Sequence, residues 1–368
     1  MIWVLLAVSS CNHEPYIPAV ESNSLIVRLK WNQSYPGETI QAIDTGLLWT
    51  FSLLGAELER GALDASRSWK QDTVILDISK LGFSVPAENA FKEILNYMRS
   101  SEEYRELNCI DLGRFVTILL CNSDNYYNIT GIPRTLDEYL SQRTTRKRRT
   151  MILNSNVSLG PRIVEIPDSV EPLDQFALVA IEGEFDSLKG KVNPEEYEVI
   201  DFLANGQLRF GVYSKDGALV DGANSNLSIG GKPSKCMWCH ESSFNPNFNN
   251  SQGHIAYLSV DSFNHIIKEF NKALNDQRLG LSGDVDFGIK QDHQYAELIY
   301  LGFMHPTDYR LSKEWGISVS QVESRLSHLP KHDYHEFEFL MGCFERADVD
   351  IYSPFKVIPV LEDERELN

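Results

Sequence analysis

The chain has 368 residues, 42% of them hydrophobic and 11% aromatic, and its 52 acidic and 34 basic side chains give a net charge of −18. Length and hydrophobic content predict a globular protein of two or three domains, with enough chain for a sizeable core. With fewer basic than acidic side chains, the protein is not expected to form a broad basic surface, so we expect no nucleic-acid partner.

The first eleven residues form a short apolar run that ends in small residues and Cys11. This run is too short to span a membrane and is typical of the end of an export signal. Its last four residues, Val-Ser-Ser-Cys, resemble the lipobox of bacterial lipoproteins, although no Lys or Arg precedes the run. The resemblance implies that Cys11 is lipidated and that the exported protein is held at the periplasmic side or the cell surface by its N-terminal lipid alone. The alternative is a buried N-terminal strand.

Residues 12–148 are expected to form a mixed α/β domain, to which the sequence assigns no role. Alternating apolar residues predict strands at 24–31 and 73–78, and apolar spacings of three and four predict helices at 43–60, 86–98 and 136–142. The continuous apolar run at 115–120 is predicted to be a buried strand. The aromatic segment 125–133 is predicted to be a loop held by aromatic packing.

The basic run at 143–149 is predicted to be a solvated linker between domains rather than a binding patch for anions. The segment that follows, up to residue 230, is expected to be rich in strands. The turn dipeptides Asn205-Gly206 and Asp216-Gly217 predict a three-stranded β-meander. The strand patterns of this segment lie at 151–157, 162–166, 176–182, 197–203 and 207–213.

The meander leads directly into Cys236-Met237-Trp238-Cys239-His240, a C-x-x-C-H pattern. The pattern resembles the haem attachment site of c-type cytochromes. This resemblance implies one covalent haem c, with Cys236 and Cys239 as thioether anchors and His240 as the proximal iron ligand. The spacing has a chemical reason, because two thiols one short turn apart can add to the two vinyl groups of the porphyrin.

Two other interpretations of the motif cysteines are a dithiol redox pair and half of a zinc site. A zinc site would need further Cys or His at close spacing, and the sequence has no second C-x-x-C. Haem is attached to such motifs on the outer side of the bacterial inner membrane, which agrees with the expected export. Lipid and haem would use three of the six cysteines. The remaining Cys109, Cys121 and Cys343 are expected to be buried thiols, or to include a Cys109–Cys121 disulfide.

An electron-transfer cytochrome commonly carries a Met or His as sixth iron ligand. Met304, in Gly-Phe-Met-His-Pro, resembles the Met that many monohaem cytochromes present from a loop after the motif, often beside a proline. His305 and His254 are the alternatives. An open sixth position would instead indicate a haem enzyme.

The region after the motif is expected to be mainly helical, with helices at 261–278, at 292–301 and from Ser318, which opens a capping box with Gln321. The sequence pattern of residues 309–329 resembles a helix-turn-helix motif. Because the chain is acidic, we expect two packed helices there rather than a DNA-binding element.

Three more histidines lie close together in the sequence, but Pro330 interrupts a helix that would align them, so exposed histidines are expected there rather than a metal site. They are His328, His332 and His335.

Together these patterns predict an α+β protein. A mixed N-terminal domain (12–148) is followed by a second domain (149–368) that contains the meander and a mainly helical haem-bearing region. The expected function is electron transfer by an exported monohaem cytochrome, with a redox partner protein that could be basic. The alternatives are a peroxidase-like haem enzyme with an open distal site, and a structural or binding lipoprotein without haem.

Overall fold

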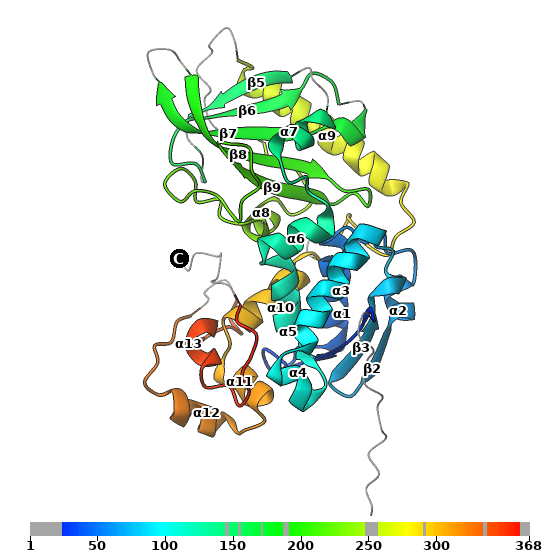
Figure 1. Ribbon diagram of the computed structural model, residues 1–368, viewed down its shortest axis with the longest axis vertical. Coiled ribbons are helices and arrows are strands. Elements are labelled where there is room, and N and C mark those ends of the chain that lie inside the picture. Colours follow the sequence, from blue (N-terminus) through cyan, green and yellow to red (C-terminus); the bar gives the residue numbers. More distant parts are fainter. Residues whose placement is uncertain are drawn as a thin grey trace, which may run out of the picture.

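The computed structural model describes residues 24–143, 147–153, 155, 157–170, 172–186, 191–246, 257–289, 292–333 and 337–360. The described chain forms two lobes, one above the other in Figure 1. The upper, meander lobe comprises the described residues between 147 and 279, and the lower, mixed lobe comprises those of 24–130 and 294–360. One continuous hydrophobic core runs through both lobes, and a second small core lies in the C-terminal part of the mixed lobe. The predicted α+β class is confirmed.

The sheet of the mixed lobe has the strand order β2-β3-β1-β4. β1 pairs antiparallel with β3 and parallel with β4, and β2 pairs antiparallel with β3. The predicted strands at 24–31 and 73–78 are confirmed as β1 and β3. The four strands are β1 (Ile26–Lys30), β2 (Arg67–Lys70), β3 (Thr73–Asp77) and β4 (Ile110–Asp111).

Six helices, α1 to α6, belong to the mixed lobe and precede the meander in the chain. A seventh helix, α7, lies between α6 and the first strand of the meander. The predicted helices at 43–60, 86–98 and 136–142 correspond to α1, α3 and α7. The side chains of Thr39 and Ser84 cap α1 and α3 by accepting backbone N–H groups. The helices are α1 (Ile40–Leu53), α2 (Ala62–Ser66), α3 (Val85–Arg99), α4 (Glu102–Leu107), α5 (Leu112–Leu120), α6 (Ser123–Thr130) and α7 (Leu136–Ser141).

Two local predictions in this half are wrong. Residues 115–120 belong to helix α5, which the side chain of Asp111 caps at the backbone N–H of Arg114. Every residue of α5 is buried, and its last six form a short, almost continuous apolar run, which does not by itself distinguish a strand from a helix. Residues 123–130 form helix α6 rather than a loop, and Gly131 ends it in the left-handed conformation with φ 68°. The expected aromatic packing is confirmed, since Tyr126 and Tyr127 are buried.

The meander lobe contains five antiparallel strands in sequential order. The predicted turn at Asn205-Gly206 is confirmed between β8 and β9, where Gly206 has φ 83°. The predicted linker is partly wrong, because residues 147–149 lie in β5, where Lys147 and Arg149 pair with Glu165 of β6. The strands are β5 (Lys147–Ile152), β6 (Arg162–Pro167), β7 (Leu178–Asp186), β8 (Lys191–Phe202) and β9 (Leu208–Ser214).

The region after the sheet is mainly helical, as predicted. The capping box of Ser318 and Gln321 is confirmed, and Gly316 separates α11 from α12 in a left-handed turn. The helix expected at 261–278 is α9, which the side chain of Ser259 caps. The helices are α8 (Pro233–His240), α9 (Val260–Leu279), α10 (Gln294–Met304), α11 (Asp308–Trp315), α12 (Val319–Leu326) and α13 (Arg346–Asp350).

Helix α10 returns the chain to the mixed lobe, where it packs against both α1 and α5. Two glycines permit this close approach. A Cβ atom on Gly46 of α1 would lie 2.8 Å from the carbonyl oxygen of Tyr295, and one on Gly113 of α5 would lie 2.6 Å from the Cβ of Phe303. The expected second domain, residues 149–368, is therefore divided between the two lobes.

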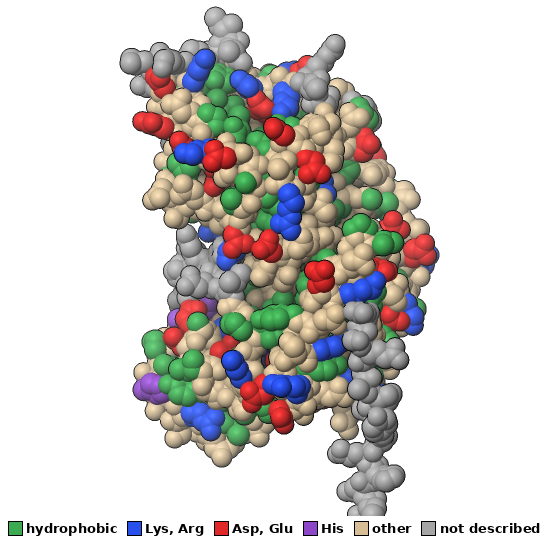
Figure 2. Space-filling view, viewed as in Figure 1, with side chains coloured by type: hydrophobic (Ala, Val, Ile, Leu, Met, Phe, Trp, Pro, Cys, Tyr) green, Lys and Arg blue, Asp and Glu red, His purple; other side chains and the backbone are tan. Residues whose placement is uncertain are grey.

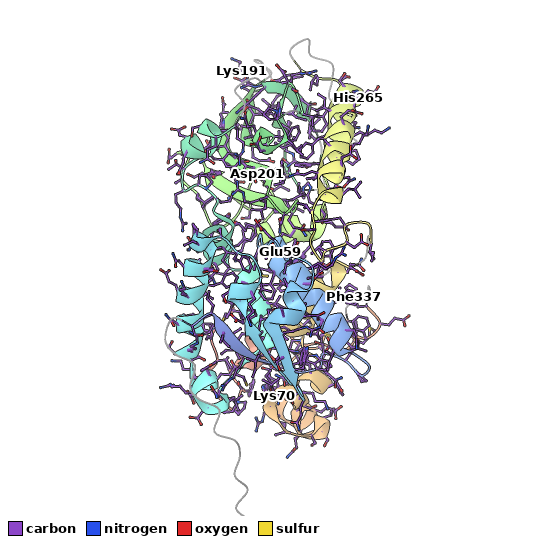
Figure 3. The ribbon with its side chains drawn as sticks, turned by 90° about the vertical axis from the view of Figure 1, so that its right-hand side faces the viewer. Glu59, Lys70, Lys191, Asp201, His265 and Phe337 are labelled. Carbon is purple, nitrogen blue, oxygen red and sulfur yellow. The ribbon has the colours of Figure 1, made fainter. Side chains whose placement is uncertain are left out.

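The junction of the lobes is held by main-chain and side-chain contacts. Glu59, labelled where the lobes meet in Figure 3, forms an antiparallel bridge with Gly283, in the segment after α9. At the tip of the β8–β9 hairpin, the Asn205 side-chain amide donates to the carbonyls of Ser52 and Ala56, at 2.8 Å each. The hairpin tip is thus fixed to the end of α1.

A buried cluster of charges surrounds Phe303 on α10. The guanidinium carbons of Arg346, Arg114 and Arg310 lie 4.0, 4.9 and 5.5 Å from the centre of the Phe303 ring. The carboxylates that pair with these three arginines are Glu103, Asp111, Glu314 and Asp350. Burial raises the pKa of Glu103 to about 7, so the cluster can reach charge balance near neutral pH.

Replacing Arg310 by Met should strongly destabilise the protein. The Arg310 guanidinium donates to both oxygens of Asp111 at 2.7 and 2.8 Å, and Asp111 is 2% exposed. The variant leaves this carboxylate buried without its counter-ion, which should lower the free energy of unfolding by about 3–5 kcal/mol. Urea unfolding at pH 7 measures the change. Arg134→Met, which breaks an exposed pair with Asp124, is the control and should cost about 0–1 kcal/mol. Equal losses in the two variants would contradict this account.

Candidate functional site

The C-x-x-C-H motif forms the last five residues of helix α8, which lies between β9 and α6. Pro233 starts the helix, where its missing N–H costs nothing, and Glu241 ends it with a positive φ of 53°. Because residues three and four apart share a helix face, Cys236, Cys239 and His240 point in the same general direction.

A cavity of about 460 Å³ opens beside this face of α8, and all three motif side chains line it. The opposite wall is the sheet of the meander lobe, to which all five strands contribute. β6 and β7 contribute alternate residues, as the two-residue period of a strand predicts, whereas β8 and β9 each contribute three consecutive residues. Helix α9 closes one side with Phe263 and Ile267. The sheet residues in the wall include Val164, Leu178, Ala180, Ile200, Phe210 and Val212. A cavity of this size and lining suits a mostly apolar ligand of several rings.

His240 is held against the cavity wall, with its ring centre 5.8 Å from that of Phe210. Burial lowers the pKa of His240 to about 4, so the imidazole is neutral at neutral pH. Within the described ranges, its buried Nδ1 atom has no hydrogen-bond partner. A buried ring nitrogen of this kind is costly unless a ligand or an ordered molecule satisfies it. A neutral imidazole is also the form that binds metal ions.

The two motif cysteines have different surroundings. Cys239 is exposed, whereas Cys236 is partly covered. Burial, reinforced by the charge of Glu198, raises the pKa of the Cys236 thiol well above its usual range. Cys236 therefore stays protonated at neutral pH, unlike the thiolate of a disulfide-exchanging pair.

One wall of the cavity carries charged groups. Arg162 of β6 lies 3.1 Å from a carboxylate oxygen of Glu182 and 3.6 Å from one of Glu198. Ser228 donates to Glu198 at 3.0 Å. Arg162 and Lys235 are the cations that line the cavity among its described residues. The sequence reasoning missed this wall, because only the pairing of the strands brings its residues to one face.

The other predicted iron ligands do not meet the motif in the described structure. Met304 is buried at the end of α10 and His305 follows it, and neither lines the cavity. His265 lies on the exposed side of α9 (Figure 3). His254 and the predicted lipidation site Cys11 lie outside the described residues.

Aromatic and polar contacts fix α8 to the mixed lobe. Trp238, the third residue from the end of α8, stacks on Tyr300 of α10 with ring centres 5.7 Å apart and planes 26° apart. Beyond the motif, His293 Nε2 lies 3.3 Å from a carboxylate oxygen of Glu241. The motif helix is therefore held between the meander sheet and α10.

Comparisons with protein-family models, with curated proteins and with solved structures gave no match. Helices long and apolar enough to cross a bilayer are absent from the described ranges. None of the five cysteines in those ranges forms a disulfide, so the expected Cys109–Cys121 alternative is not adopted.

The buried imidazole of His240 should make the cofactor-free protein less stable in acid. The unfolded chain protonates this ring near pH 6.5 and the folded protein only near pH 4. The associated stability is complete above pH 6.5 and is lost as the pH falls towards 4, by on the order of 1–3 kcal/mol. Urea unfolding at pH 7.5 and pH 5 should show a smaller loss for His240→Gln than for the unmodified protein. His265→Gln, on the exposed side of α9, is the control, and a loss unchanged by His240→Gln would refute the assignment.

Proposed function

We propose that this protein binds one haem c covalently through Cys236 and Cys239, with His240 as proximal iron ligand, and that it transfers electrons. The observation that carries the proposal is that both thiols and the imidazole line a single, mainly apolar cavity of about 460 Å³. Haem iron cycles between ferrous and ferric states and so carries one electron. The chain's own contribution is to hold, orient and enclose the group.

The residues present fit this group in three respects. The apolar strand faces and α9 offer the dry surroundings that a porphyrin needs. Arg162 of β6 and Lys235 of α8 also line the cavity and supply cations with which its carboxylates can pair. The neutral ring of His240 is ready to bind iron without losing a proton first.

The two competing interpretations of the cysteines are less well supported. A dithiol oxidoreductase needs a thiolate, and burial raises the pKa of Cys236. A zinc site needs a set of converging donors, and among the described His, Cys, Asp and Glu residues such a set lies elsewhere, not at the motif. Haem attachment, in contrast to disulfide exchange, does not require that Cys236 or Cys239 have a low thiol pKa in the folded protein.

Export and lipid attachment at Cys11 remain part of the proposal, since haem is joined to such motifs outside the bacterial inner membrane. The net charge of −18 supports a basic redox partner. On the face drawn in Figure 2, however, acidic and basic side chains are interspersed, so the docking surface for such a partner is not marked by a single-sign patch there.

A second function, a haem enzyme with an open distal side, is favoured by one observation. Among the described residues that line the cavity, His240 is the sole Met or His. The iron would then keep its sixth position for water or a small substrate such as a peroxide, as in peroxidases.

Covalent haem should depend on the motif cysteines. Protein produced together with the haem c maturation machinery should gain the mass of one haem and give a c-type pyridine haemochrome spectrum. The Cys236→Ala, Cys239→Ala double variant should lose both signals. Cys109→Ala, which alters a buried cysteine outside the cavity, is the matched control and should keep them. A bare polypeptide mass in cells that mature a control cytochrome would refute the proposal.

The spin state of the iron should separate the two functions. If the cavity provides no sixth ligand, the ferric protein should be high-spin and should bind cyanide, and Met304→Leu should leave its spectrum unchanged because Met304 does not line the cavity. A low-spin spectrum that turns high-spin in Met304→Leu would instead place Met304 on the iron. Visible absorption and electron paramagnetic resonance spectra of the two proteins provide the measurement.

A further inference from the structure

We propose that His305, His332 and Glu345 form a binding site for a divalent transition metal, of which zinc suits the donors best. Two imidazoles and one carboxylate are a common zinc set, with water as the fourth ligand. This site is separate from the cavity at Cys236–His240 and does not depend on the presence of haem there.

The donor atoms already converge. The Nδ1 atom of His305 lies 3.1 Å from the Nε2 atom of His332 and 3.8 Å from a carboxylate oxygen of Glu345. One ligand atom from each residue lies within 4.8 Å of the other two. A tetrahedral ion with bonds of about 2.0–2.1 Å spaces its ligands roughly 3.3–3.4 Å apart. The site can therefore close on an ion with small movements of the side chains.

The two imidazoles meet edge to face and do not stack, since their planes are 86° apart and their centres 5.1 Å apart. The Nε2 atom of His332 faces His305, and its Nδ1 atom lies 3.6 Å from a carboxylate oxygen of Glu345. A hydrogen bond between two neutral rings also fits the 3.1 Å separation, and the experiment below must distinguish the two arrangements.

Backbone hydrogen bonds hold the three chain segments in place. His305 ends α10, where its N–H donates to the carbonyl of Leu301 at 2.8 Å. His332 and Cys343 exchange two backbone hydrogen bonds at 3.0 and 2.8 Å, and the N–H of Phe344 donates to the carbonyl of Pro306 at 3.0 Å. The site is thus pre-organised before an ion arrives, which reduces the entropic cost of binding.

Access and charge also suit a metal ion. His305 is buried, His332 is 24% exposed at its side chain and Glu345 is 40% exposed, so an ion can enter from the Glu345 side. Lys331, the residue before His332, is paired with Asp308 and not with Glu345. The sequence grouped His332 with His328 and His335, but His328 bonds to the Tyr352 hydroxyl at 2.7 Å and His335 lies outside the described residues.

An ion bound here would join the end of α10 to the 332–345 segment and to the start of α13. It would therefore act as a clip across the C-terminal part of the mixed lobe. Fixed at three points, the ion would keep one coordination position for water.

Cobalt titration of the full-length chain tests the site. The Cys236→Ala, Cys239→Ala background removes the motif thiols, which could otherwise bind cobalt and would show a thiolate charge-transfer band. We expect one equivalent of Co²⁺ to give the visible absorption of a tetrahedral ion, and Zn²⁺ to displace it. Glu345→Gln should weaken binding by at least about tenfold and His332→Asn by about 100-fold.

His328→Asn is the matched control, because it removes a nearby exposed histidine that is outside the cluster. It should retain the affinity of the background protein. Glu345→Gln preserves side-chain size at a partly exposed position, and circular dichroism would verify that its fold is kept. Absence of saturable cobalt binding, or equal affinity in Glu345→Gln, His332→Asn and His328→Asn, would overturn the proposal.

Discussion

The packing of α10 depends on the buried charges around Phe303. Three guanidinium groups enclose this ring, and each is paired with carboxylates from another part of the chain: Asp111 from the start of α5, Glu314 from α11 and Asp350 from α13. Arg346 also donates to the carbonyl of Phe303 itself, at 2.8 Å. Asp111 depends on Arg310 for its ion pair, whereas Glu314 and Asp350 are each shared between arginines, so the cluster joins α10 and the C-terminal helices to the mixed lobe as one network.

Both candidate sites take their position from α10. Tyr300, one turn before Phe303, stacks on Trp238 and so locates the motif helix against the meander sheet. His305, two residues after Phe303, brings an imidazole to His332 and Glu345. Met304, the neighbour of Phe303, is buried in the core at the end of α10.

The sequence was a good guide where its signals were local. The strands with clear alternation, the hairpin turn at Asn205-Gly206, the capping box at Ser318 and the motif itself could be recognised from neighbouring residues. The short apolar run of the buried helix α5 fits a strand equally well, and the aromatic segment that Gly131 ends fits a loop as well as the helix α6 that it forms. The cavity wall and the His305–His332–Glu345 cluster could not be predicted, because strand pairing and helix return bring together residues that are far apart in the chain.

Because α10 completes a lobe that began before the meander, the order of synthesis bears on folding. The apolar faces of α1 and α5 leave the ribosome long before the helix that covers them, whereas the meander sheet can meet α9 as soon as that helix is made. A nascent chain therefore exposes α1 and α5 while the meander lobe is completed. Chaperones that recognise exposed apolar helices would find their target in this interval, and a second copy of α10 could occupy the same position in a domain-swapped dimer.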